Sequence, residues 1–139
     1  MDELALKEIM TTDLVTIHID KNLSYVAEIF KTKALHHIPV VDDEGSLTGI
    51  ISLTDFERIT VGASLFRNPE KEAYNEALLK SMLVSQIMTK DVVKLHPTDS
   101  IRAAYKIFKE NKFRAIPIVG KGQLMGIVTP IDILDYFFK

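Results

Sequence analysis

The sequence contains no cysteine, which excludes disulfide bonds and metal sites built from thiolate ligands. It also has no excess of basic residues, because 17 lysines and arginines face 19 acidic residues and the net charge is −2. Nucleic acid and anionic membranes are therefore not expected as partners. No apolar run reaches the roughly 20 residues of a membrane span. The first four residues lack the basic and apolar regions of a signal peptide, so we expect a soluble cytoplasmic protein.

An internal repeat organises the chain. When Pro39 is aligned with Pro117 (117 − 39 = 78), identical residues meet along most of two segments. In the first copy these are Ile9, Met10, Thr11, Asp13, Val15, His18, Ile29, Phe30, Lys31, Ile38, Pro39 and Val41. One residue drops out in a turn, and Gly45, Leu47, Gly49, Ile50 and Asp55 then match at a spacing of 77 (132 − 55). Each copy is small for a core of its own, so we expect the two to share one.

Each copy predicts the order β-α-β-β-α. In the first copy the predicted segments are an extended run at 14–17, an amphipathic helix after Asn22, strands at 38–41 and 47–51, and a last helix from Ser52. In the second copy they are an extended run at 92–95, an amphipathic helix after Ser100, strands at 116–119 and 124–128, and a last helix from Thr129. Proline near the start of the second strand predicts the first residue of that strand or an edge strand. The fold class is therefore α/β.

Residues 57–86 belong to neither copy. Pro69 and the acidic residues that follow it suit a helix start, which predicts an extended inter-repeat helix with breaks at Gly62 and Asn68-Pro69. The predicted organisation is a first repeat at 1–60, an inter-repeat helical segment at 61–84 and a second repeat at 85–139, which together form one compact module.

The segments 49–55 and 126–132 share the pattern Gly-apolar-apolar-Ser/Thr-x-x-Asp. One interpretation is helix capping, in which the hydroxyl of Ser52 or Thr129 accepts a backbone hydrogen bond and the carboxylate favours the positive end of the helix. Pro130 at the first helical position fits this interpretation.

The same pattern also suits a ligand. A helix start favours a phosphate, and the carboxylate of Asp55 or Asp132 would accept hydrogen bonds from ribose hydroxyls. The glycine upstream would let the ligand approach the backbone. Capping and ligand binding are compatible, because the hydroxyl can cap the helix while the carboxylate faces the ligand.

The doubled β-α-β-β-α unit, the Ile-Pro-Val-Val and Ile-Pro-Ile-Val strands and the two Ser/Thr-x-x-Asp segments resemble a tandem pair of CBS (cystathionine β-synthase) domains, a Bateman module. The resemblance covers essentially the whole chain. It implies two repeats related by a pseudo-twofold axis, a homodimer, and a non-catalytic regulatory module that signals to an effector protein. It also implies that AMP, ADP, ATP or S-adenosylmethionine acts as the effector, with no cofactor required.

The resemblance implies ligand sites that mix the two repeats. The first site would combine Ser52, Thr54 and Asp55 with Val93, Lys112, Arg114 and Ile116. The second would combine Thr129 and Asp132 with Val15, His36 and Ile38. By resemblance, the two aspartates hold ribose, Ser52 and Thr129 reach ribose or phosphate, and the apolar residues enclose adenine. We expect the first site to bind phosphate more tightly, because a guanidinium pairs with phosphate through two hydrogen bonds and a histidine offers a weaker, pH-dependent contact.

Other interpretations remain open at this stage. One alternative is a ligand-free interaction module whose repeats only dimerise, with the Ser/Thr-x-x-Asp segments serving as caps. The apolar C-terminus at 133–139 suits either packing within the last helix or a dimer surface. His36 and His37 lack further ligands at metal-binding spacing, so no metal site is expected. His18 and His96 are interpreted as surface or turn residues, and no pairing of a nucleophile with a base suggests an enzyme.

Overall fold

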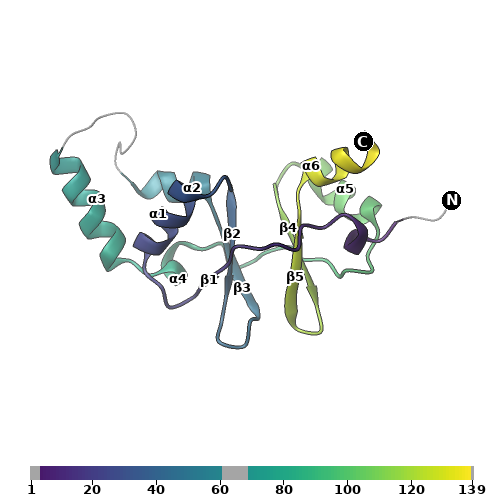
Figure 1. Cartoon of the computed structure of the whole chain (residues 1–139), viewed down its shortest axis with the longest axis horizontal. Coiled ribbons are helices and arrows are strands. Elements are labelled where there is room, and N and C mark those ends of the chain that lie inside the picture. The colour runs from purple at the N-terminus through teal and green to yellow at the C-terminus, as the bar shows by residue number, and fades with distance from the viewer. Residues whose placement is uncertain (1–3, 61–68, 139) are drawn as a thin grey trace. The chain divides into compact units, whose positions relative to one another are not determined.

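The structure is a computed structural model that describes residues 4–60 and 69–138. Within these residues the chain forms two compact units. Unit 1 contains residues 4–15, 45–47 and 91–138, and unit 2 contains residues 16–44, 48–60 and 69–90. In each unit, helices cover one face of a small sheet (Figure 1). The predicted α/β class with two repeats of strands and helices is confirmed.

Unit 2 is built around the first repeat. Its elements are β1 (Ile17–His18), α1 (Leu23–Thr32), β2 (His37–Val41), β3 (Leu47–Ser52), α2 (Leu53–Ile59), α3 (Pro69–Ser81) and α4 (Val84–Ile87). The strands form one sheet in the order β1-β2-β3, and β1 runs parallel to β2. Asn22 caps α1, since its side chain accepts a hydrogen bond of 3.0 Å from the N–H of Ser24.

Unit 1 is built around the second repeat. Its elements are a short 3₁₀ helix η1 (Leu6–Glu8), α5 (Ile101–Lys109), β4 (Ile116–Gly120), β5 (Gln123–Val128) and α6 (Pro130–Phe137). The strands β4 and β5 form an antiparallel hairpin. Ser100 caps α5 by accepting a hydrogen bond of 3.1 Å from Ala103. Both predicted N-caps, Asn22 and Ser100, are therefore confirmed.

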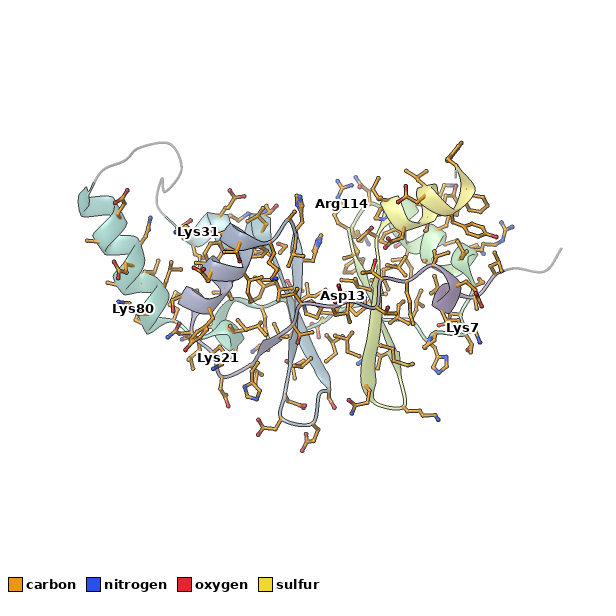
Figure 2. All side chains as sticks on the ribbon, in the orientation of Figure 1. Lys7, Asp13, Lys21, Lys31, Lys80 and Arg114 are labelled. Atoms are coloured by element: carbon orange, nitrogen blue, oxygen red, sulfur yellow. The ribbon has the colours of Figure 1, made fainter. Side chains whose placement is uncertain are left out.

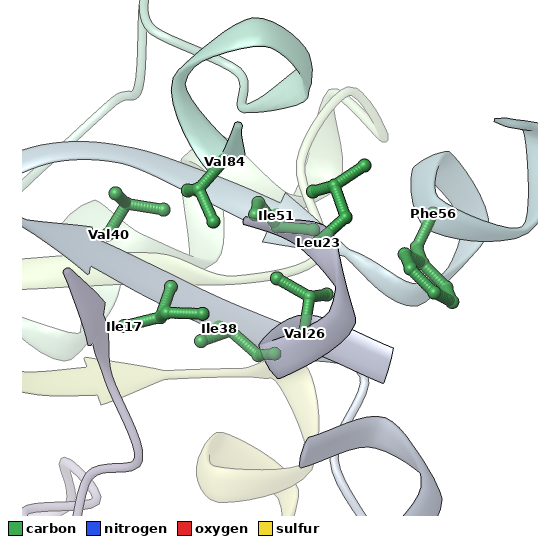
Figure 3. Close-up of a cluster of buried hydrophobic side chains, with 8 residues drawn as sticks. All are labelled: Ile17, Leu23, Val26, Ile38, Val40, Ile51, Phe56 and Val84. Carbon is green, nitrogen blue, oxygen red and sulfur yellow. The ribbon is translucent and has the colours of Figure 1, made fainter. Parts of the chain in front are cut away.

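Each unit has its own hydrophobic cluster. The cluster of unit 2 consists of Ile17, Leu23, Val26, Ile38, Val40, Ile51, Phe56 and Val84 (Figure 3). The cluster of unit 1 consists of Leu6, Ile101, Ala104, Ile116, Ile118, Val128 and Ile133. The first helix and the hairpin of each repeat supply most of these side chains, as the apolar patterns predict.

The first strand of each repeat is shorter than predicted, and proline explains why. In unit 1 the predicted strand 92–95 is reduced to a bridge at Leu95, whose N–H donates to Pro117 and whose carbonyl accepts from Val119. The next hydrogen bond, which would extend this strand toward its N-terminal end, needs a backbone N–H at position 117, and proline has none. Pro39 stops β1 at Ile17 in the same way. Both predicted positions of Pro39, the first residue of a strand and an edge strand, are wrong, because Pro39 is the third residue of β2 and β2 lies between β1 and β3.

The segments that begin the two repeats are exchanged between the units. Residues 4–11 lie at the start of the first repeat but pack in unit 1 with the second, and residues 82–89 lie at the start of the second repeat but pack in unit 2 with the first. The same backbone bonds recur at the spacing of 78: Leu6 donates to Asp99 at 2.8 Å, and Val84 donates to Lys21 at 2.8 Å. Leu6 and Val84 are both 0% exposed, so each core contains a residue from an exchanged segment. The predicted domain limits at 60 and 84 stay a prediction.

Candidate ligand-binding site

The start of α2 in unit 2 carries the first predicted carboxylate. Ser52 is the N-cap, and its hydroxyl accepts a hydrogen bond of 3.0 Å from the N–H of Asp55. The carboxylate of Asp55 forms an ion pair with Arg58, 2.9 Å between Oδ1 and Nη1. The Asp55 side chain is 33% exposed and that of Arg58 is 73% exposed. The capping interpretation is confirmed for Ser52, while the Asp55 side chain stays accessible beside a cation.

Two histidines lie next to this helix start. The carbonyl of His36 accepts a hydrogen bond of 2.8 Å from the N–H of Leu53, the first residue of α2. His37 is half-buried at the start of β2. Burial lowers the pKa of His37, the neighbouring His36 lowers it further, and the carboxylate of Asp55 opposes both effects. Unit 2 by itself therefore gathers Asp55, Arg58, His36 and His37 around one helix start.

The start of α6 in unit 1 carries the second predicted carboxylate. Oδ2 of Asp132 accepts hydrogen bonds from the N–H of Thr129 at 2.8 Å and from its hydroxyl at 3.2 Å. Oδ1 accepts a bond of 3.4 Å from the hydroxyl of Thr11 in the exchanged N-terminal segment. The backbone of Thr11 is fixed by two bonds to Ile127, of 2.9 and 3.0 Å. Neutral donors from two segments therefore orient the Asp132 carboxylate.

The remaining predicted site residues are divided between the units. Val93, Lys112, Arg114, Ile116 and Val15 belong to unit 1, and Thr54 and Ile38 belong to unit 2. Arg114 is exposed just before β4 (Figure 2), and Lys112 is exposed as well. Ile38 and Ile116 are 0% exposed and lie in the clusters of their own units. The two predicted sets each draw on both units, so these groupings stay predictions.

The predicted role of the two upstream glycines is wrong. A Cβ on Gly49 would lie 2.7 Å from Sδ of Met88 and 2.8 Å from the carbonyl oxygen of Thr89. A Cβ on Gly126 would lie 2.7 Å from Sδ of Met10. An exchanged segment of the protein itself, rather than a ligand, therefore occupies the space that each glycine leaves.

Two residues beside the carboxylates were given no role by the sequence analysis. Thr11 was noted only as identical to Thr89, and Arg58 lies outside the matched positions. The signal for Arg58 was present in the repeat, because at the spacing of 77 it corresponds to Asp135 (135 − 58). No local pattern identifies Thr11, since its partner Asp132 lies 121 positions away.

The two recurrent histidines stabilise turns. Nε2 of His18 lies 2.5 Å from Oδ1 of Asp43, and its Nδ1 accepts a bond of 3.1 Å from the N–H of Asp20. Nδ1 of His96 accepts a bond of 3.1 Å from the N–H of Thr98. His18 is the last residue of β1 and His96 directly precedes a turn, so both border turns.

Three further observations concern other kinds of site. Among residues 4–60 and 69–138, no group of three or more histidine, aspartate or glutamate residues is arranged to hold a metal ion. Over the same residues no helix combines the length and apolar character needed to cross a bilayer. A groove of ≈ 370 Å³ lies between α1 and α3 in unit 2, with Lys31 and Glu76 in its lining, and it contains none of the predicted ligand residues.

Comparison with known sequences places the chain in a family. The CBS domain model matches twice, at residues 6–61 and 84–139. A CBS domain-containing protein of Dictyostelium discoideum is 30% identical over 138 residues, which are 99% of this chain and 93% of that protein. A homoserine O-acetyltransferase of Methanococcoides burtonii is 29% identical over 127 residues, which are 91% of this chain but only 22% of the relative.

Solved structures agree with this assignment. The CBS domain of a CBS domain containing membrane protein from Sphaerobacter thermophilus superposes with a TM-score of 0.82 at 29% identity, covering 96% of this chain and 87% of that one. CBSX2 in complex with AMP has a TM-score of 0.77 at 20% identity, with 96% and 95% of the two chains covered. The CBS domain pair of protein MJ0100, in complex with 5′-methylthioadenosine and S-adenosyl-L-methionine, has a TM-score of 0.73 at 23% identity, with 98% and 97% covered. The chain therefore belongs to the CBS domain family and carries two CBS repeats in tandem.

Proposed function

We propose that the chain is a non-catalytic regulatory module that binds adenosyl ligands and passes the signal to an effector protein. The observation that carries this proposal is the pair of half-buried carboxylates, Asp55 and Asp132, each at a helix start beside a hydroxyl residue. Such a carboxylate suits the two hydroxyls of a ribose. AMP in the CBSX2 structure and 5′-methylthioadenosine with S-adenosylmethionine in the MJ0100 structure support this ligand class.

The proposed sites keep the groupings that the resemblance implies. One ligand is held by Ser52, Thr54 and Asp55 with Val93, Lys112, Arg114 and Ile116. The other is held by Thr129 and Asp132 with Val15, His36 and Ile38. Because each set combines both repeats, a ligand that prefers one arrangement of the repeats shifts the balance between arrangements. An effector protein then reads that shift.

A thermal-shift series with AMP, ADP, ATP and S-adenosylmethionine tests this proposal. A ligand that binds only the native state raises the melting temperature, by an amount that grows with its concentration. We expect at least one of the four to do so at millimolar concentration, and guanosine monophosphate serves as the control for base recognition. No shift with any adenosyl ligand would contradict the proposal.

A second candidate function is favoured by the surface of α6. This helix buries Ile133 but leaves large apolar side chains exposed, with Ile131 at 60% and Phe137 at 64%, and the C-cap residue Phe138 is 83% exposed. Exposed apolar patches mark interaction surfaces. We propose that α6 contributes to a homodimer, which a ligand-free interaction module would also form. Sedimentation of Phe137→Lys tests this role of α6. The charge should weaken a dimer built on the helix, and a sedimentation coefficient equal to that of the wild type would contradict the role.

A further inference from the structure

The helical turn after each proposed ribose carboxylate carries an opposite charge in the two repeats. Arg58 of α2 and Asp135 of α6 occupy corresponding positions, each three residues after the carboxylate and on the same helix face. We propose that these two residues determine ligand choice. The carboxylate Asp55 then takes an adenosyl ligand that bears phosphate, and Asp132 takes one whose 5′ group is uncharged or cationic. This inference rests on the proposed function.

The carboxylate of Asp55 has a cation as its partner. Arg58 pairs with Oδ1 at 2.9 Å and neutralises the carboxylate, yet its side chain is 73% exposed and a guanidinium has five donors. A ligand whose ribose binds Asp55 therefore meets a pair of about zero net charge with further guanidinium donors exposed to solvent, which favours an anionic 5′ group.

Around Asp132 the donors are neutral and the neighbouring charge is negative. Thr129 and Thr11 hydrogen-bond to both carboxylate oxygens without cancelling their charge. Asp135 is exposed and has no ion pair among residues 4–60 and 69–138. The first turns of α6 therefore present two uncompensated negative charges, which repel a phosphate and tolerate a thioether or a sulfonium.

The size of the effect follows from Coulomb's law. A unit charge at roughly 8 Å from a singly charged phosphate changes affinity about twofold at the dielectric constant of water and about thirtyfold at the effective value of a protein surface. Reversing a charge beside a doubly charged phosphate multiplies this effect, and salt reduces it. We therefore expect charge reversal to change AMP affinity on the order of tenfold at low ionic strength. The affinity of a ligand with no 5′ charge should change little.

The test uses AMP and 5′-methylthioadenosine, which share adenosine and differ at the 5′ group. In calorimetry, Asp55→Ala keeps only the Asp132 site and should bind 5′-methylthioadenosine more tightly than AMP. Asp132→Ala keeps only the Asp55 site and should bind AMP more tightly than 5′-methylthioadenosine. Adding Asp135→Arg to Asp55→Ala should raise AMP affinity about tenfold. Adding Arg58→Asp to Asp132→Ala should lower AMP affinity by a similar factor, and Asp135→Asn and Arg58→Gln should give intermediate changes.

Each outcome bears on one claim. Suppose that AMP and 5′-methylthioadenosine both bind the wild-type chain, but that adding Asp135→Arg to Asp55→Ala, or Arg58→Asp to Asp132→Ala, leaves the ratio of their affinities unchanged. The inference is then overturned while the proposed function stands. If neither ligand binds the wild-type chain at millimolar concentration, the proposed function itself fails. Circular dichroism checks that each variant is folded. If the effect is electrostatic, it should be weaker at 0.5 M salt, where the Debye length is about 4 Å.

Discussion

Hydrogen bonding distinguishes the two carboxylates that correspond in the repeats. Asp55 accepts a charged bond from Arg58, whereas Asp132 is held by Thr129 and by Thr11. The common ancestor of the repeats accounts for the shared Ser/Thr-x-x-Asp pattern, and the neighbours account for the difference. A single residue type therefore has two environments, and we propose that each environment sets what the carboxylate binds.

His37 gives the stability of unit 2 a dependence on pH. Its folded pKa lies below the unfolded value of 6.5, chiefly because burial disfavours the charged ring. The unfolded state then binds more protons between the two pKa values, so the free energy of unfolding is highest above the unfolded pKa. It falls as the pH drops through 6.5 toward the folded pKa. Urea unfolding of His37→Gln should show a smaller loss of stability than the wild type over this range.

The control for His37→Gln is His36→Gln. This variant removes only a secondary cause of the lowered His37 pKa, so it should reduce the pH dependence less. Equal pH dependence of the wild type and His37→Gln would contradict the assignment.

Gly49 is required by the close approach of an exchanged segment. A methyl group there would meet the backbone oxygen of Thr89 at 2.8 Å, and this oxygen accepts the N–H of Ile50 at 3.0 Å. We expect Gly49→Ala to cost about 1–3 kcal/mol in the free energy of unfolding. Gly126→Ala should cost less, because the corresponding oxygen of Thr11 lies farther away, at 3.0 Å. Denaturant titration measures both, and a neutral Gly49→Ala would contradict the packing.

At the scale of elements, the exchanged segments decide which parts of the chain stabilise one another. Residues 4–11 supply Leu6 to the cluster of unit 1 and pair with Ile127 of β5. Residues 82–89 supply Val84 to the cluster of unit 2 and pair with Ile50 of β3. Neither repeat, taken as a continuous stretch of sequence, contains its whole core.

Leu6→Ala tests this exchange. The side chain is 0% exposed, so its truncation should cost about 2–5 kcal/mol. Native-state hydrogen exchange should show the lost protection in α5 and in the β4-β5 hairpin, because local openings report the unit in which a contact lies. Val84→Ala is the matched variant and should loosen α1 and β2 instead. Loss of protection in α1 on Leu6→Ala would contradict the exchange.

Some elements could be predicted from the sequence and others could not. Apolar periodicity and the caps Asn22 and Ser100 predicted α1, α5 and both hairpins, because these depend on neighbours within a few residues. The exchange could not be predicted, since Ile-Met-Thr occurs identically at 9–11 and 87–89 and fits either repeat. The same limit explains the wrong role given to Gly49 and Gly126, whose neighbours are distant in sequence. The shortened first strands needed the hydrogen-bond register that places Pro39 and Pro117 opposite them.

At the scale of the whole molecule, two CBS repeats with two differently surrounded carboxylates support a sensor with unequal sites. The proposed grouping of Asp55 with Arg114 would provide cations for phosphate, whereas the proposed grouping of Asp132 with His36 would provide fewer. The account therefore predicts that AMP binding depends mainly on Asp55. The exposed apolar side chains of α6 offer a surface for assembly.

Calorimetric titration of AMP into the wild type, Asp55→Ala and Asp132→Ala tests this central claim most directly. We expect the wild type to bind AMP, Asp55→Ala to lose most of the binding, and Asp132→Ala to retain it. The lost ribose hydrogen bonds to a charged group correspond to about 1.5–3 kcal/mol each, or more than tenfold in affinity. Absence of AMP binding by the wild type, or equal loss in both variants, would contradict the account.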